Sequence, residues 1–143
     1  YTNKACVQIE PEFRKEFRGK MRGIDTRSTT LSFGEYGLKA QGRSWLTSRV
    51  IEAGRRAITH SLKKGGKFWI RIFPDKPVTA RDAGQRMGGG KGEIDRYVAV
   101  VRPGRIIYEI AGVTDEVAKE AFTRAKVKLP LKTKIISRKV SRD

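Results

Sequence analysis

The chain has 143 residues, and its 32 Lys and Arg against 15 Asp and Glu give a formal net charge of +17. This length suits one domain with its own core, and such a charge favours an anionic partner, above all RNA or DNA. Cys6 and His60 are the only cysteine and histidine, which excludes an intrachain disulfide and a Cys/His zinc site. No apolar run is long enough to span a membrane. We therefore expect no cofactor, no metal site and no membrane partner.

The N-terminal residues 1–28 show no hydrophobic periodicity, and FRKEFRGKMRG (13–23) alternates cations with two phenylalanines. This pattern predicts a basic, partly extended arm rather than a helix or strand. The next segment, TLSFGEYGLKA (30–40), alternates as a strand does, but Gly34 and Gly37 interrupt it. The interruption predicts a bent strand or a loop.

The segment LTSRVIEAGRRAITHSLKKGG (46–66) predicts the first helix, with Thr47 or Ser48 capping its start and Gly65 ending it. Apolar and small residues share one face of this helix: Ile51, Gly54, Ala57, Ile58 and Leu62. Cations populate the rest: Arg49, Arg55, Arg56, Lys63 and Lys64. Such a face could simply be solvated, but the chain has too few acids to balance it, which favours a bound polyanion.

Two further segments predict strands. KFWIRIF (67–73) alternates in the manner of a strand, and Pro74 and Pro77 are expected to stop it. RYVAVVRPGRIIYEI (96–110) has Pro103-Gly104 at its centre, and these residues suit the inner positions of a type II turn. We therefore expect a β-hairpin over 96–110.

A second helix is predicted from Thr114, because Asp115 and Glu116 lie favourably in its positive first turn, and it should end before Pro130. Its expected apolar face is formed by Val117, Ala121, Phe122 and Ala125. KTKIIS (132–137) predicts a final strand, followed by a basic tail.

Together these elements predict an α+β fold in which two helices pack on a mostly antiparallel sheet. A long, basic, glycine-rich loop is expected at residues 80–95. We expect two parts along the chain: an extended basic arm with an N-terminal extension over 1–28, and a single α+β RNA-binding domain over 29–143.

The stretch GQRMGGGKGE (84–93) resembles a nucleotide cradle only superficially. A Walker A loop needs Ser or Thr after Gly90-Lys91, where Gly92 stands, and the GxGxxG pattern fails at Glu93. The loop also leads toward a strand, so no helix N-terminus awaits a phosphate.

Bare glycine backbone together with Arg81, Arg86 and Lys91 can instead lie close against a phosphate backbone. A flexible solvent loop is the alternative, but a length of about fifteen residues favours binding. Met87 has nothing local to pack on and suits a groove on a partner.

Other candidate residues have simpler interpretations. His60 is interpreted as an exposed helix residue, because no Ser-His-Asp arrangement can be assembled from the spacing. Trp69, Phe73 and Tyr97 could stack on bases, although strand aromatics more often belong to a core. No paired carboxylates are placed for acid–base catalysis, so we expect no catalytic residues and no enzyme.

Several runs of the sequence are similar to the bacterial-type large-subunit ribosomal protein L-sixteen family, over roughly residues 13–137. These runs are SFGEYGLKA (32–40), LTSRVIEAGRRAIT (46–59), GGKFWIRIFPDKPVT (65–79), RMGGGKG (86–92), YVAVVRPGRIIYEIAGV (97–113) and KLPLKT (128–133). Plastid versions resemble the chain most, particularly around IEAGRRA and RIFPDKPVT.

The resemblance implies a hammerhead-type α+β fold embedded in large-subunit rRNA near the A-site side of the peptidyl-transferase centre. It implies rRNA, tRNA and neighbouring ribosomal proteins as partners, with no homo-oligomer. Cations are expected to bind rRNA: Arg14, Lys15, Arg18, Lys20, Arg22, Arg43, Arg49, Arg55, Arg56, Lys63, Lys64 and Lys76. The glycine loop is expected to lie near tRNA, through Arg81, Arg86, Met87, Gly88, Gly89, Gly90, Lys91 and Gly92.

The chain departs from the family pattern in a few places. Gly89 stands where bacterial members usually carry Lys, and Arg96-Tyr97 replaces a Tyr-Trp pair. Glu12 and Glu16 fall in an arm that is normally more basic. Residues 1–12 look like an N-terminal extension, which favours an organellar ribosome. We expect the chloroplast, with the mitochondrion or the bacterial cytoplasm as alternatives, and a free-standing RNA-binding or assembly factor as the alternative function.

Overall fold

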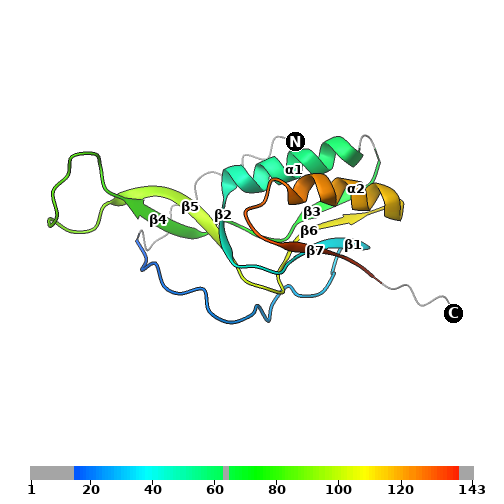
Figure 1. The fold of residues 1–143 in the computed structure, drawn as a ribbon, viewed down its shortest axis with the longest axis horizontal. Helices are drawn as coiled ribbons and strands as arrows, with labels where there is room; N and C mark the ends of the chain where they lie inside the picture. The colour runs from blue at the N-terminus through cyan, green and yellow to red at the C-terminus, as the bar shows by residue number, and fades with distance from the viewer. Residues whose placement is uncertain (1–14, 63–64, 139–143) are drawn as a thin grey trace.

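The computed structural model describes residues 15–62 and 65–138 (Figure 1). Within them the chain forms two helices and seven strands, which confirms the predicted α+β class. The helices are α1 (Ser48–Leu62) and α2 (Asp115–Lys126). The strands are β1 (Tyr36–Ala40), β2 (Ser44–Thr47), β3 (Lys67–Ile70), β4 (Lys76–Ala80), β5 (Glu93–Val101), β6 (Ile106–Ala111) and β7 (Thr133–Ser137).

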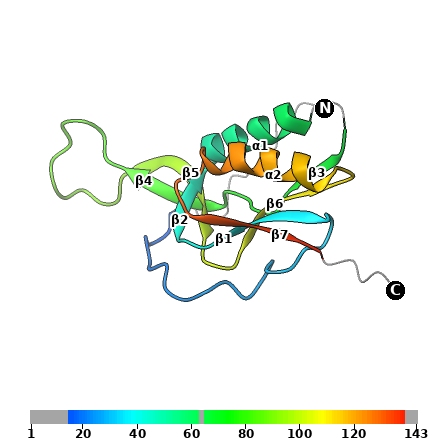
Figure 2. The same ribbon diagram turned by 45° about the vertical axis from the view of Figure 1, so that its right-hand side comes forward.

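The strands form two antiparallel sheets where the sequence predicted one. The first sheet has the order β3-β6-β1-β7, and the second has the order β2-β5-β4. Both helices lie side by side over one face of the first sheet, and the second sheet extends away from them (Figures 1 and 2).

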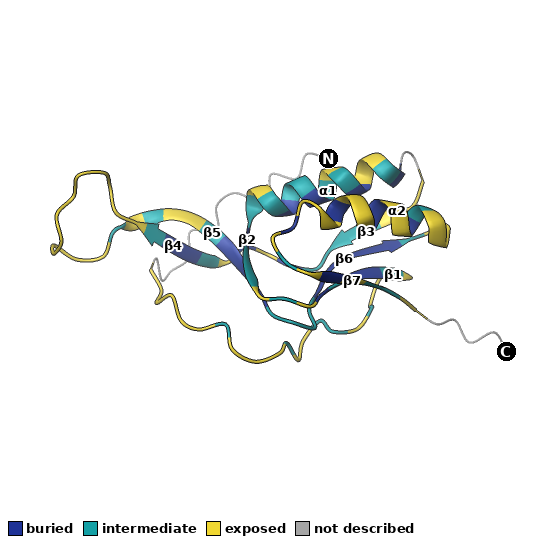
Figure 3. Cartoon of the chain, viewed as in Figure 1, coloured by how far each residue is buried: buried dark blue, intermediate teal, exposed yellow. Residues whose placement is uncertain are grey.

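The core fills the space between the helices and the first sheet, as the dark blue residues of Figure 3 show. Tyr108 of β6 is fully buried there, and its hydroxyl donates to the carbonyl oxygen of Ile51 at 2.8 Å. Gly54 makes room for this side chain, because a Cβ at Gly54 would lie 2.4 Å from the Tyr108 hydroxyl oxygen. Glycine at position 54, on the predicted apolar face of α1, is thus required by the packing against Tyr108.

The predicted starts of both helices agree with the structure. Thr47 precedes α1, and its side-chain oxygen accepts a bond from the backbone N–H of Val50 at 3.4 Å. The second helix begins at Asp115 after Thr114, as predicted. Its buried face includes Ala118 as well as the predicted Ala121, Phe122 and Ala125, whereas Val117 is only partly buried.

The prediction of a β-hairpin over 96–110 is wrong. Both strands and the turn form: the N–H of Arg105 bonds the carbonyl of Arg102 at 3.3 Å, and Gly104 has a φ of 99°. However, β5 pairs with β2 and β4, whereas β6 pairs with β3 and β1. A type II turn does not match the twist of a two-stranded hairpin. The chain accordingly passes from one sheet into the other at this turn.

Backbone bonds to other segments hold this crossing in place. Ala40 exchanges two bonds with the turn, donating to Arg105 at 2.7 Å and accepting from Gly104 at 2.8 Å. Asp25 donates to Pro103 at 2.9 Å. The backbone groups that a hairpin would have paired internally are therefore used by more distant residues.

The second sheet also corrects the prediction for residues 67–80. The strand predicted over 67–73 ends at Ile70, and Pro77 lies inside β4 instead of stopping a strand. Because β4 is at the edge of its sheet and pairs only with β5, the missing N–H of a proline is tolerated there. The four-residue β2 was not predicted. Residues 15–28 form no helix or strand.

Candidate nucleic-acid interface

The glycine loop, residues 81–92, joins the ends of β4 and β5 that point away from the helices (Figure 1). Gly88, Gly89 and Gly90 have φ values of 99°, 77° and 98°, which L side chains rarely adopt. A Cβ at any of these three would meet nothing within 4 Å, so backbone conformation rather than packing requires glycine here. The loop therefore presents bare peptide groups to its surroundings.

The neck of the loop is tight. A Cβ on Gly92 would lie 2.2 Å from the carbonyl oxygen of Ala80 on the opposite strand. The register between β4 and β5 shifts nearby, between Val78 and Thr79. Glycine at position 92 thus allows β4 and β5 to approach each other closely at the base of the loop.

The side chains of the loop are exposed. Arg86 forms no hydrogen bond or ion pair with any residue of the described part of the chain, and Met87 is 89% exposed. A guanidinium nitrogen of Arg81 contacts the Met87 sulfur at 2.9 Å across the loop. A free guanidinium on a protruding loop is available to donate a pair of bonds to phosphate.

The N-terminal arm contacts the base of this loop. The ammonium group of Lys15 donates to the carbonyl oxygen of Lys91 at 3.1 Å and forms an ion pair with Glu93 at 3.4 Å. In return, the ammonium group of Lys91 donates to the carbonyl oxygen of Glu16 and lies 5.5 Å from the ring centroid of Phe17. The two elements predicted to bind RNA separately thus form one basic surface.

Lys76 of β4 extends this surface along the arm. Its ammonium group donates to the carbonyl oxygen of Arg18 at 2.6 Å and lies 5.3 Å from the ring centroid of Trp45. Further along, the guanidinium of Arg43 donates to the carbonyl oxygen of Gly23 at 3.4 Å. Both cations predicted as rRNA ligands therefore also hold the arm against the second sheet.

The cations of α1 belong to a different part of the molecule, because α1 and the arm lie on opposite sides of the sheets (Figure 1). Glu52 accepts two bonds from Arg55, at 2.8 and 2.6 Å, and one from Arg56 at 3.2 Å. The hydrogen bond from Arg55 holds the pKa of Glu52 below its usual value, against a smaller opposing effect of burial. Arg56 keeps 76% of its side chain exposed, whereas Arg55 keeps 29%, so Arg56 is the more available of the two.

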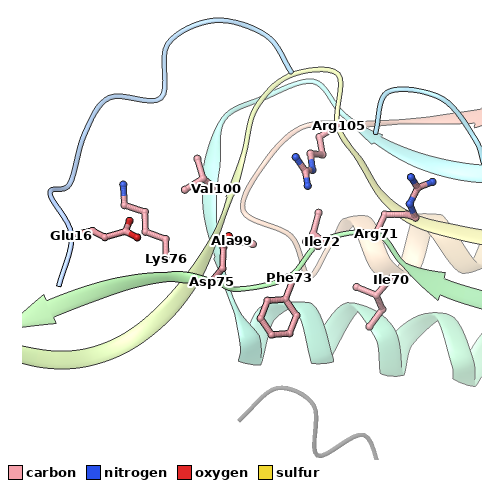
Figure 4. A pocket seen from close by; sticks show the side chains of 10 residues that line it. All are labelled: Glu16, Ile70, Arg71, Ile72, Phe73, Asp75, Lys76, Ala99, Val100 and Arg105. Carbon is pink, nitrogen blue, oxygen red and sulfur yellow. The ribbon is translucent and has the colours of Figure 1, made fainter. Parts of the chain in front are cut away.

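A hollow of about 560 Å³ lies between the arm, the β3–β4 connection and β5. Figure 4 shows Lys76 and Glu16 on one side and Arg71 and Arg105 on the other, with Phe73 beside them. Arg105 forms an ion pair with Asp25 of the arm at 3.2 Å. Asp75 also lines the hollow, and Arg71 is paired with Glu109, so the hollow presents little free positive charge.

The remaining predicted rRNA ligands are placed as follows. Lys20, Arg22 and Arg49 are exposed and make no hydrogen bond or ion pair within the described part of the chain. Arg14, Lys63 and Lys64 lie outside the described residues. His60 is exposed on α1, as predicted, and approaches Arg124 of α2 at 3.5 Å.

Sequence reasoning missed the buried ion pair between Arg71 and Glu109. Glu109 of β6 has no exposed surface, and its carboxylate accepts bonds from the N–H groups of Phe33 and Gly34, each at 2.7 Å, and from the Arg71 guanidinium. Burial would raise the pKa of Glu109, but these hydrogen bonds outweigh it and hold the pKa below its usual value. The signal was present, because Glu109 is the lone charge in the apolar run IIYEIA.

Two further properties bear on function. Neither helix in residues 15–62 and 65–138 is long and apolar enough to cross a membrane. In the same ranges, no three side chains of His, Cys, Asp or Glu come together as a possible metal site.

The basic loop, arm and helix face on an α+β scaffold define a protein of the class that binds a polyanion such as RNA. Residues 9–136 match the family described as Ribosomal protein L16p/L10e, so the chain belongs to this family of large-subunit ribosomal proteins. The predicted family is thereby confirmed. Membership makes the protein a structural component of a ribosome that acts in translation beside rRNA and neighbouring ribosomal proteins, and the family is a non-enzymatic one.

Proposed function

We propose that the protein lies at the A-site side of the peptidyl-transferase centre, where the glycine loop contacts tRNA and the rest of the basic surface contacts rRNA. The observation that carries this proposal is the protruding loop, with its bare peptide groups and with Arg86, which has no partner among the described residues. A loop that projects this far from the core can reach a ligand that the body of the domain does not touch.

In this proposal the predicted cations contact two different rRNA segments. The arm residues Lys15, Arg18, Lys20 and Arg22, together with Arg43 and Lys76, follow one rRNA segment along the second sheet. Arg49 and Arg56 of α1 contact a second rRNA segment on the helix side. Phosphate contacts of this kind position a protein without reading sequence, and they suit a component that is fixed in a ribonucleoprotein.

The tRNA contact is assigned to Arg86, with Lys91 in a supporting role. Lys91 is already bonded to the carbonyl oxygen of Glu16 in the arm, so it fixes the base of the loop. Arg86 has no such partner in the described part of the chain, and its planar fork can bind phosphate or stack on a base.

The proposed location is a plastid ribosome. This part of the proposal is supported by the similarity of IEAGRRA and RIFPDKPVT to plastid versions of the family. Fractionation of the source cells tests it directly, because a mitochondrial or bacterial protein would not be recovered with plastid ribosomes.

Site-directed crosslinking tests the function. A photoreactive residue placed at Met87 should crosslink to A-site tRNA in assembled ribosomes, whereas one placed at Arg49 should crosslink to rRNA. After a high-salt wash, the protein should remain with the large subunit. Loss from the subunit during that wash would indicate a transient assembly factor, and a Met87 adduct with rRNA alone would contradict the tRNA contact.

A further inference from the structure

One exposed aromatic ring is held rigidly on the face of the first sheet that the helices do not cover. Phe33 lies in the segment 31–34, which crosses this face above Glu109 of β6. The Glu109 carboxylate accepts the N–H groups of Phe33 and Gly34 at 2.7 Å, and that of Ser32 at 3.3 Å. A buried carboxylate that binds successive peptide groups fixes the segment before any ligand arrives.

The same segment is also fixed by packing. Gly37 of β1 is paired with Glu109, and a Cβ on Gly37 would lie 2.4 Å from a methyl carbon of Leu31. Leu31 therefore occupies the space above Gly37. On the outer side, the guanidinium of Arg138 donates to the carbonyl oxygen of Leu31 at 3.0 Å.

The ring of Phe33 rests on two side chains of the segment 69–71, which covers the end of β3 and the residue after it. It stacks on Trp69 with ring centroids 6.0 Å apart and an interplanar angle of 23°, and the guanidinium carbon of Arg71 lies 5.0 Å from its centroid. Trp69 and Arg71 are two residues apart in an extended segment, so they project to the same side. Phe33 covers both and still keeps 60% of its surface exposed.

We propose that the exposed face of Phe33 is a stacking platform for an unpaired base of rRNA. Every base offers a π-face to such a ring, and a guanidinium beside the ring adds cation–π attraction. The inference rests on the proposed function, in that it requires rRNA to pass over the first sheet, and it adds a site there that is separate from the loop, arm and helix cations.

The charges around Phe33 favour RNA over a protein partner. Arg138 and Lys39 flank the segment: the Arg138 guanidinium donates to the carbonyl oxygen of Leu31, and the Lys39 ammonium group donates to that of Thr29 at 3.3 Å. Glu109 and Arg71 are largely buried and paired with each other, so they add no net charge, and Glu35, next to the segment, is an exposed acid. A net positive rim around an aromatic ring matches a nucleotide, whose base stacks while its phosphate meets the cations.

Substitutions of Phe33 separate stacking from general contact. Phe33→Leu keeps an apolar side chain but removes the ring, and it should weaken binding of the full chain to transcribed large-subunit rRNA about 5- to 150-fold, as expected for one lost base stack. Phe33→Tyr keeps the ring and should bind within about twofold of the unchanged protein. Val127→Ala is the control, because Val127 is 78% exposed at the end of α2 and far from this face.

The outcomes distinguish this inference from the proposed function. If the unchanged protein binds rRNA and Phe33→Leu binds equally well, the platform is wrong and the proposed function stands. If the unchanged protein fails to bind rRNA, both fall. Independently of folding in the Leu variant, a benzoylphenylalanine at position 33 in assembled subunits should form an RNA adduct. An adduct with a ribosomal protein in its place would overturn the inference.

Discussion

Lys91, at the base of the glycine loop, donates a hydrogen bond to the backbone carbonyl oxygen of Glu16 in the N-terminal arm. Lys15 completes the contact from the other side, through the Lys91 carbonyl oxygen and the Glu93 carboxylate. These bonds join segments about 75 residues apart in the sequence. The position of the arm and the base of the loop are therefore coupled in the free protein.

Replacing Lys91 tests this coupling. Lys91→Met keeps the length of the side chain but removes its three donors, so the arm should detach more often and trypsin should cleave after Arg18 several times faster. The melting temperature should hardly change, because exposed ion pairs contribute about 0–1 kcal/mol. Lys134→Met, on the exposed side of β7, is the control. Equal cleavage in the two variants would show that Lys91 does not hold the arm.

Glu109→Gln should be strongly destabilising. The substitution keeps the shape of the side chain, but it leaves the Arg71 guanidinium largely buried without its counter-ion. Breaking a buried pair in this way costs about 3–5 kcal/mol of unfolding free energy, measurable by urea denaturation at neutral pH. A loss below about 1 kcal/mol would mean that the pair contributes little and that other bonds hold segment 31–34 in place.

The acid stability of the protein should depend on the same residue. Because the folded-state pKa of Glu109 is lowered from 4.5, its contribution is fully present above about pH 4.5 and is lost as the pH falls through the folded pKa. The free energy of unfolding of the unchanged protein should therefore fall steeply below about pH 4.5. The Glu109→Gln variant should show a shallower dependence in that range, and identical slopes for the two proteins would contradict the assignment.

Gly54→Ala should destabilise the protein by about 1–3 kcal/mol, although alanine ordinarily favours a helix over glycine. The reason is steric, since the new Cβ would lie 2.4 Å from the hydroxyl oxygen of Tyr108. Tyr108→Phe removes that oxygen at a cost of about 1 kcal/mol for the lost bond to Ile51. In the Tyr108→Phe background, Gly54→Ala should cost clearly less. Additive costs in this double-mutant cycle would exclude the clash as the cause.

Arg55 and Arg56 should differ in their effect on rRNA binding. Arg56→Gln should reduce the slope of log affinity against log salt by about 0.7–0.9, the value for one lost phosphate contact. Arg55 uses two donors on Glu52, so Arg55→Gln should change that slope less and lower the stability of α1 more. Binding measured over a salt series for both variants checks this, and the reverse order would show that Arg55 is the phosphate ligand.

Both helices and the last strand could be predicted from the sequence, because their periodic apolar residues and end signals are local. The prediction of a hairpin over 96–110 was wrong because a turn signal in the sequence does not specify which strands β5 and β6 pair with. The short strand β2 was missed because Ser44–Thr47 is too brief to show a pattern.

Only the part of the candidate site that is local in the sequence could be predicted. Glycine and cations in one run identify the loop without any knowledge of the fold. The contact of Lys91 with the arm, and the support of Phe33 by Glu109 and Trp69, join residues that are distant in the sequence. Such contacts depend on the arrangement of the two sheets, which no local pattern specifies.

The most direct test of the central claim is the activity of ribosomes that carry Arg86→Ala. Arg86 is exposed on the loop, so the variant should enter the large subunit at normal occupancy, as measured by quantitative mass spectrometry. Loss of one or two charge-assisted bonds, each worth about 1.5–3 kcal/mol, should slow A-site tRNA accommodation in single-turnover peptide-bond formation by about tenfold or more. Arg86→Lys should restore this only in part, because an ammonium group lacks the fork. Normal accommodation at full occupancy would contradict the assignment of the loop to tRNA, and so would a variant that never enters the subunit.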